Sequence, residues 1–282
     1  MYPTVTAVVA IFALLARVSA QHDDSDVSVT LDSGCKSFLD ALDTNDKLAT
    51  CLKSVTDATS AFSSVDDSLA ASSADVEGAL NTLCASTACA TEDIASLLTQ
   101  FAAACPTDLV NVQDVSAQYD MLYNLVPIKN SLCIKDGATF CALKKAVVGP
   151  ADALQLPDGD MSQIVMANLD AMGAANLGFL FMRPDSPVTA LCSTCFQDVL
   201  AAYVDWEDTI PYEIGVNLSP LLQGQAQLWA SVTTNCSAEV AANVAVKGGA
   251  APESAASLRA TVPASLAAAA VALVAGVFAL AL

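Results

Sequence analysis

Histidine, the residue best suited to acid–base work near neutral pH, occurs only once in the chain, as His22. Ser-His-Asp and Cys-His catalytic arrangements need a positioned histidine, and His22 lies in an acidic N-terminal segment. The sequence also lacks a Gly-x-Ser-x-Gly motif and a glycine-rich phosphate-binding loop. These absences argue against the common histidine-dependent hydrolases, and we predict no catalytic histidine and no cofactor.

Positively charged residues are also scarce. The chain has 11 Lys and Arg against 30 Asp and Glu, a net charge of −19. Without its two ends, which carry Arg17, Arg259 and Glu253, the charge is about −20. Such a surface repels nucleic acids and anionic membranes. We therefore expect no nucleic-acid partner, and instead an unknown extracellular partner such as a wall glycan or a protein.

Residues 1–20 have the pattern of a secretory signal peptide. No charged residue lies between Val5 and Leu15, and Val18 and Ala20 supply the small side chains expected before a cleavage site. The apolar run is short for a membrane span, and the acidic segment 21–32 follows it. Because no Lys or Arg precedes the run, a buried N-terminal helix is the alternative interpretation.

Residues 262–282 form an apolar tail. Upstream of it lie the small residues Gly248-Gly249-Ala250 and a polar spacer. This order is typical of a glycosylphosphatidylinositol (GPI) attachment signal, with the lipid on Gly248 or Gly249. Residues 254–256 are a second candidate site, and a single membrane-spanning helix is the alternative. Either way, we expect the domain outside the cell, attached to the membrane only through its tail.

All ten cysteines lie between these two end segments. They are Cys35, Cys51, Cys84, Cys89, Cys105, Cys133, Cys141, Cys192, Cys195 and Cys236. An even number confined to the exported part predicts five disulfides, whose pairing the sequence does not give. Cys192 and Cys195 form a Cys-x-x-Cys motif, but a zinc site needs a second pair or suitably spaced histidines. We therefore predict no metal site.

Apolar residues recur at helical spacing along most of the chain. Clear stripes are Ile94, Leu97, Leu98, Phe101 and Cys105, and later Cys192, Cys195, Phe196, Val199, Tyr203 and Trp206. Thr91, as a capping residue followed by two acidic residues, predicts a helix start, and Ser219-Pro220 predicts another. Pro106 and Pro127 predict helix ends. Convincing alternating strands are absent.

The predicted fold is therefore an all-α, disulfide-stapled bundle of about six to eight helices. The helical ectodomain spans residues 33–237, with a signal helix before it and an apolar tail after it. Residues 238–261, rich in Ala, Gly and Ser, are interpreted as a stalk that carries the anchor site. The segment 149–187 is irregular and is either a long excursion or a hinge between two sub-bundles.

The best remaining candidate for catalysis is Asp205-Trp206-Glu207-Asp208. Paired carboxylates cleave glycosidic bonds, and Trp206 could stack on a sugar. The competing interpretation, which we favour, is an acidic helix end whose tryptophan belongs to the core. Asp158 and Asp160 lack the remaining ligands of a calcium loop. We accordingly predict no catalytic, cofactor-binding or metal-ligating residues.

Two Asn-x-Ser sequons make Asn217 and Asn235 candidate N-glycosylation sites. Pro220 directly follows the first sequon. The middle residue of the second is Cys236, an expected disulfide partner. Both features work against glycan attachment.

The cysteine framework resembles that of a fungal family of secreted, GPI-anchored surface proteins built on a domain of unknown function. The matching elements, over residues 33–240, are Gly34-Cys35, Leu48-Ala49-Thr50-Cys51, Leu83-Cys84, Cys89, Cys105, Tyr119, Tyr123, Leu132-Cys133, Phe140-Cys141, Leu191-Cys192-Ser193-Thr194-Cys195 and Cys236. The resemblance implies the location and the fold type and assigns no activity. We expect an extracellular structural or binding protein. The alternative is a carbohydrate-active surface enzyme that uses Asp205, Glu207 and Asp208.

Overall fold

The computed structural model describes residues 30–60, 72–87, 89–144 and 173–247. The expected signal peptide, the apolar tail and the anchor site at Gly248 or Gly249 lie outside these residues. So do Asp158 and Asp160, with most of the irregular segment.

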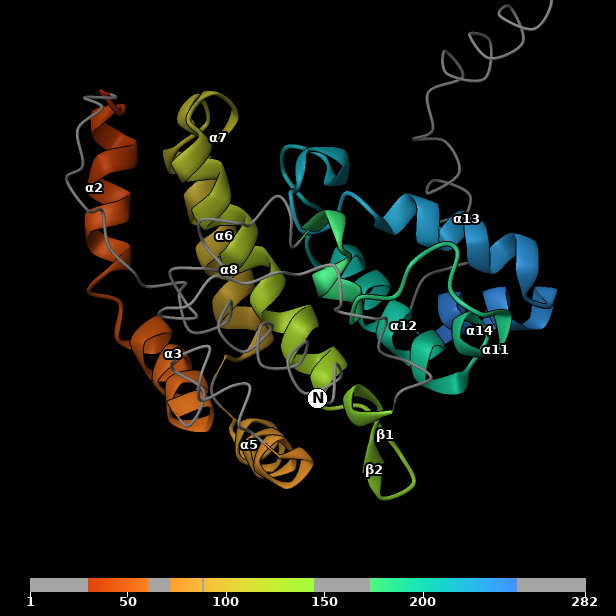
Figure 1. Ribbon diagram of the computed structural model, residues 1–282. Coiled ribbons are helices and arrows are strands. Elements are labelled where there is room, and N and C mark those ends of the chain that lie inside the picture. Colours follow the sequence, from red (N-terminus) through yellow and green to blue (C-terminus); the bar gives the residue numbers. More distant parts are fainter. Residues whose placement is uncertain (1–29, 61–71, 88, 145–172, 248–282) are drawn as a thin grey trace, which may run out of the picture.

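The described chain is mostly helical, and the all-α class is confirmed (Figure 1). Eight helices have seven residues or more in the described ranges. They are α2 (Ser33–Leu42), α3 (Asp46–Thr59), α5 (Ser73–Ala85), α6 (Thr91–Ala104), α8 (Gln113–Leu132), α12 (Thr194–Thr209), α13 (Gln225–Asn235) and α14 (Ala238–Lys247). Shorter elements are α7 (Asp108–Asn111), α11 (Val188–Leu191) and the 3-10 turns η2 (Cys141–Leu143), η4 (Leu177–Phe179) and η5 (Val216–Leu218).

A small hairpin, which the sequence did not predict, follows α8. Strands β1 (Lys135–Asp136) and β2 (Thr139–Phe140) pair antiparallel, with Lys135 opposite Phe140. Gly137 supplies the positive φ that this tight turn needs. Each strand has only two residues, which is too short to leave an alternating pattern in the sequence.

Helix α8 is the centre of the molecule. It packs against α5, α6 and α7 on one side and α12 on the other, and Figure 1 shows it between these two groups of helices. The predicted end at Pro127 is wrong, because the helix continues to Leu132. Proline removes one intrahelical hydrogen bond, but Val126, Ile128 and Leu132 are all buried beside it, and this packing maintains the helix.

Helix starts follow local chemistry in some places and not in others. The Asn45 side chain accepts a hydrogen bond from the backbone N–H of Leu48 at the start of α3, and Ser72 with Asp75 forms a capping box on α5. Thr91, however, is the first residue of α6 rather than its cap, and no side chain caps that helix. Its acidic residues lie in the first turn as expected.

All ten cysteines are paired, which confirms the five disulfides. The pairs are Cys35–Cys105, Cys51–Cys89, Cys84–Cys133, Cys141–Cys195 and Cys192–Cys236. The first three join α2, α3, α5, α6 and the end of α8, and the last two join the region from η2 to α13. No bridge connects the three-bridge group (residues 35–133) with the two-bridge group (residues 141–236). Apart from the backbone between Cys133 and Cys141, these two disulfide groups are therefore held together by non-covalent packing.

The first ten residues of the expected stalk are helical. Residues 238–247 form α14, which packs along α12 and also contacts α13. Val244 of this helix is fully buried. The alanine-rich composition that suggested a stalk is equally favourable to a helix, and burial of one apolar face decides between the two. The bundle thus extends at least to Lys247.

Candidate functional site at the junction of α8 and α12

The three carboxylates singled out in the sequence lie on the last turns of α12. Asp205 and Asp208 are exposed, whereas Glu207 is partly buried. Trp206 points into the core with 2% of its surface exposed, and its ring makes an edge contact with Tyr123 at 5.7 Å between centroids. The tryptophan is a core residue, as the helix-end interpretation predicts.

Glu207 is the one member of this group with a defined partner. Its Oε1 accepts a hydrogen bond of 2.6 Å from Nε2 of Gln225, the first residue of α13. Desolvation, with a smaller contribution from the nearby charge of Asp208, raises the pKa of Glu207 to about 7 against the opposing effect of the Gln225 bond. The contact attaches the end of α12 to the start of α13.

The most unusual polar residue is Asp120 of α8, which the sequence did not single out. It is fully buried. Its carboxylate accepts hydrogen bonds from Tyr212 Oη (3.0 Å), the Leu221 N–H (3.1 Å) and Asn124 Nδ2 (3.2 Å), and from the Ser219 hydroxyl. A buried charge is tolerated only with such compensation.

Two opposing effects set the ionisation of Asp120. Burial penalises the charged form and raises the pKa, the hydrogen bonds from its four donors lower it, and the net result is a pKa of about 6. At neutral pH the group is therefore an anion whose oxygens are surrounded by donors. This arrangement leaves it no role as an accessible base or nucleophile.

The donors to Asp120 show what the carboxylate does. Asp120 belongs to α8 in the three-bridge group, whereas its donors Tyr212, Ser219 and Leu221 follow α12 in the two-bridge group. Ser219 also accepts a hydrogen bond of 2.9 Å from the Leu222 N–H. The helix predicted at Ser219-Pro220 instead begins at Gln225. Asp120 thus anchors residues 212–221 across the junction between the two groups.

A layer of aromatic rings surrounds this anchor. Tyr212 makes edge contacts with Tyr119 (5.2 Å) and Tyr123 (4.7 Å). Tyr123 donates a hydrogen bond of 2.8 Å to the carbonyl of Ile210. Burial raises the pKa of Tyr119 to about 12, and it raises those of Tyr123 and Tyr212 as well. These tyrosines remain neutral, so they contribute packing and hydrogen bonds rather than proton transfer.

Residues 173–182 pack against both α8 and α12. Three non-glycine residues here, Asn176, Leu180 and Phe181, have positive φ angles, a conformation that costs energy and needs support from its surroundings. Tyr203 of α12 supplies part of this support by donating a 2.6 Å hydrogen bond to the Gly178 carbonyl. A Cβ atom at Gly224 would lie 1.7 Å from Asn176 Oδ1. This close packing explains the glycine at 224.

Sequence reasoning missed Asp120, although a signal for it exists. Residues 119–128 read Tyr-Asp-Met-Leu-Tyr-Asn-Leu-Val-Pro-Ile, which is apolar around the whole helix except at Asp120 and Asn124. A helix that is apolar all round is buried, and its few polar side chains must then bond to each other or to a neighbour. The identity of that neighbour depends on residues about a hundred positions away, which no local pattern specifies.

The other predicted sites are located as follows. Cys192 and Cys195 bond to different partners, Cys236 and Cys141, so their motif is not a redox pair. Asn235 ends α13, and Asn217 lies in η5.

Among the described residues, no group of three or more His, Cys, Asp or Glu side chains could hold a metal ion. No helix in the described ranges is long and apolar enough to cross a membrane.

Comparisons with known proteins assign no family. No protein-family model matches the chain, and no curated protein or solved structure shows significant similarity to it.

Proposed function

We propose that this is an extracellular surface protein with a structural or binding role, tethered by a GPI anchor on Gly248 or Gly249. The observation that carries the proposal is the complete pairing of ten cysteines in five disulfides. Disulfides form and persist in the secretory pathway and outside the cell, so they indicate an extracellular protein. The anchor and the role are the parts that need testing.

Several features support a binding or structural role over catalysis. Trp206 is buried in the core, so this cluster offers no aromatic platform for a sugar. Asp120 uses its carboxylate to join the two disulfide groups. The strongly negative surface would suit a cationic partner. The resemblance to fungal GPI-anchored surface proteins is part of the same proposal.

A second candidate function rests on Glu207. A carboxyl group whose pKa is raised to about 7 can act as a general acid near neutral pH. In a carbohydrate-active enzyme, Glu207 would donate the proton to the leaving sugar oxygen, and Asp205 or Asp208 would be the second carboxylate. The hydrogen bond from Gln225 favours the alternative in which Glu207 only connects two helices.

The anchor can be tested directly on the surface protein. Phosphatidylinositol-specific phospholipase C should release it from intact cells. Proteolysis after Glu239 should then give a C-terminal peptide that begins at Val240 and ends at Gly248 or Gly249 with an attached ethanolamine phosphate. A peptide that ends in residues 254–256 would move the anchor to the second candidate site. Recovery of residues 262–282 from the mature surface protein would overturn the GPI anchor.

A further inference from the structure

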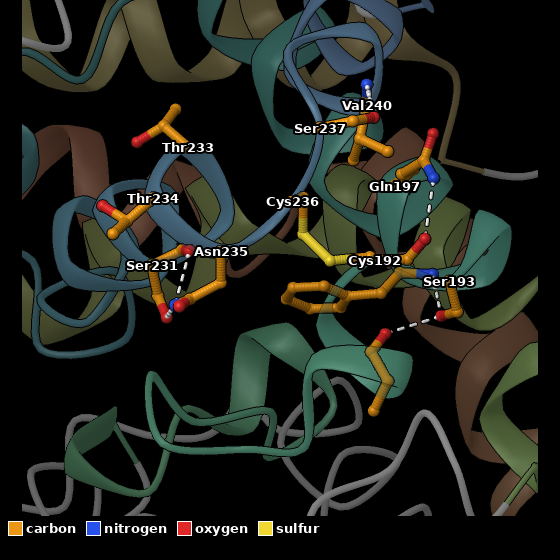
Figure 2. Close-up of a disulfide and its surroundings, with 12 residues drawn as sticks. Cys192, Ser193, Gln197, Ser231, Thr233, Thr234, Asn235, Cys236, Ser237 and Val240 are labelled. Carbon is orange, nitrogen blue, oxygen red and sulfur yellow. Dashed lines mark hydrogen bonds between the residues drawn. A yellow bond between two sulfur atoms is a disulfide. The ribbon is translucent and has the colours of Figure 1, made fainter.

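The turn between α13 and α14 holds both the second sequon and one end of a disulfide (Figure 2). Asn235 is the last residue of α13, and Ser237 directly precedes α14. Between them, Cys236 is bonded to Cys192, with 5.5 Å between their Cα atoms. The three residues of the sequon therefore occupy a helix end, a covalent bridge and a helix start.

We propose that Asn235 is N-glycosylated and that closure of the Cys192–Cys236 bridge competes with glycan transfer. The inference rests on the proposed secretory route, since N-linked glycans are added in the compartment where disulfides form. It goes beyond that route by assigning a modification site and a determinant of its occupancy.

The folded protein can carry a glycan at this corner. Asn235 is exposed, as are its neighbours Thr234, Ser237 and Glu239. Within the described part of the chain, its Nδ2 donates hydrogen bonds only to the Ser231 carbonyl (3.0 Å) and hydroxyl (3.1 Å), on the helix surface. A glycan on Nδ2 would replace one of its hydrogens, leave the other available and face solvent. The modification is thus compatible with the final fold.

Transfer of a glycan to Asn235 in the folded protein is disfavoured. The transferase must reach a segment that can leave its native conformation, whereas Asn235 has helical backbone here. The Ser237 hydroxyl accepts a hydrogen bond of 3.4 Å from the Val240 N–H (Figure 2). Gln197 Nε2 donates a 3.0 Å hydrogen bond to the Cys192 carbonyl beside the bridge. Once the bridge closes and α14 packs on α12, the sequon is held in place.

The order of synthesis allows the two reactions to compete. Cys236 is the last of the ten cysteines, and its partner Cys192 is 44 residues earlier. When the Asn235 sequon enters the oxidising compartment, Cys192 is already there. Bridge closure and glycan transfer then act on the same three residues, so their relative rates set the fraction of chains that carry the glycan.

The Asn217 sequon provides an internal comparison. Its hydroxyl residue, Ser219, is 1% exposed and bonds to Asp120, and Pro220 follows it. No cysteine lies within this sequon. Any glycan at Asn217 should therefore be insensitive to the Cys192–Cys236 bridge, whereas occupancy at Asn235 should depend on it.

The test uses the full chain expressed in a eukaryotic secretory host. Enzymatic deglycosylation converts each modified asparagine to aspartate, and peptide mass spectrometry of total and secreted protein then gives the occupancy. The wild type is compared with Cys192→Ser, which keeps the sequon and prevents the bridge. Cys84→Ser is the matched control because it breaks a bridge in the other disulfide group. Asn235→Gln removes the site and so identifies the mass-spectrometry signal that belongs to a glycan on Asn235. Denatured total protein is measured, so the result does not require the variants to fold.

Partial occupancy of Asn235 is expected in the wild type, rising toward completion in Cys192→Ser and unchanged in Cys84→Ser. An unmodified Asn235 in both wild type and Cys192→Ser overturns the site. The competition is overturned if Asn235 is fully occupied in the wild type or if its occupancy is equal in the wild type and Cys192→Ser. It is also overturned if occupancy rises as much in Cys84→Ser as in Cys192→Ser. A chain that is not exported and keeps reduced cysteines contradicts the proposed secretory function instead, so the two failures are distinguished.

Discussion

The hydroxyl of Tyr212 donates a 3.0 Å hydrogen bond to the carboxylate of Asp120, a residue 92 positions earlier in the chain. Both residues are buried. One belongs to the group of helices closed by three disulfides and the other to the group closed by two. Because no disulfide joins the groups, this contact is part of the non-covalent packing that holds them together.

Tyr212→Phe tests that bond with minimal change of shape. Losing a hydrogen bond to a buried charged group should lower the free energy of unfolding by about 1–3 kcal/mol. Asp120→Ala leaves several buried donors without an acceptor and should cost roughly 3 kcal/mol or more. Denaturant unfolding of the oxidised protein measures both.

Asp208→Asn is the control, because Asp208 is exposed, and it should change stability by less than about 0.5 kcal/mol. In the Asp120→Ala background, Tyr212→Phe should cost much less than it does alone. Additive costs would show that the two residues are not coupled.

Acidification should stabilise the protein over the range in which Asp120 titrates. Burial raises its pKa from the ordinary 3.8 to about 6. Between these values the folded state binds the proton more readily than the unfolded state does. The free energy of unfolding therefore falls as pH rises through this window, by roughly 3 kcal/mol for this group. Melting temperatures measured from pH 4 to pH 8 provide the test.

The pKa of Glu207 is raised from 4.5 to about 7. Its titration should therefore also lower the free energy of unfolding as pH rises, and should extend this pH dependence to about pH 7. Reduced repulsion among surface carboxylates adds a contribution of the same sign. Glu207→Gln should flatten the upper part of the profile, whereas Asp205→Asn, an exposed change on the same helix, should leave it intact. A melting temperature that rises steadily from pH 5 to pH 8 would contradict both assignments.

The disulfide pairing predicts how the chain separates after a single cut. A protease site inserted at the exposed turn Gly137-Ala138 lies between Cys133 and Cys141, so cleavage should give two fragments on a non-reducing denaturing gel. A site inserted after Gly149 should give fragments that remain linked through Cys141–Cys195 until reductant is added. Fragments that stay linked after the first cut would show a bridge between the two groups.

Two glycines give opposite expectations for the same substitution. Gly224→Ala would place a Cβ atom 1.7 Å from Asn176 Oδ1, and relief of the clash must displace buried structure, so we expect a loss of about 1–3 kcal/mol. Gly78→Ala lies inside α5 with nothing within 4 Å of the new atom. It should stabilise the protein by about 0.5–1 kcal/mol. Thermal unfolding of the two variants compares them, and equal effects would contradict the tight packing at 224.

The acidic end of α12 distinguishes the two proposed functions. For a binding or structural protein, replacing Asp205, Glu207 and Asp208 with Asn, Gln and Asn should preserve surface function, while Trp206→Ala should cost about 3–5 kcal/mol by creating a cavity. For an enzyme, the triple variant should lose activity at nearly unchanged stability. Glucan or chitin processing and the melting temperature are measured on both variants. Loss of glycan turnover in a stable triple variant would favour the enzyme.

Local patterns in the sequence were sufficient for several of the helices and for the number of disulfides. The stripe from Ile94 to Cys105 predicted α6, and the stripe from Cys192 to Trp206 predicted α12 together with the burial of Trp206. Helical periodicity depends on neighbours three and four positions apart, so it can be read without the fold. The number of disulfides likewise followed from composition and the expected location alone, because an even number of cysteines lies in the region expected to be exported.

Tertiary structure alone decided the features that depend on distant residues. It selected one pairing of the cysteines, carried α8 through Pro127, and made a packed helix of residues 238–247 rather than a stalk. It also brought Asp120 to Tyr212 and Ser219. Each outcome is set by burial and by contacts between residues far apart in the chain. The free energy of such contacts depends on where the chain returns in space, which local periodicity does not encode.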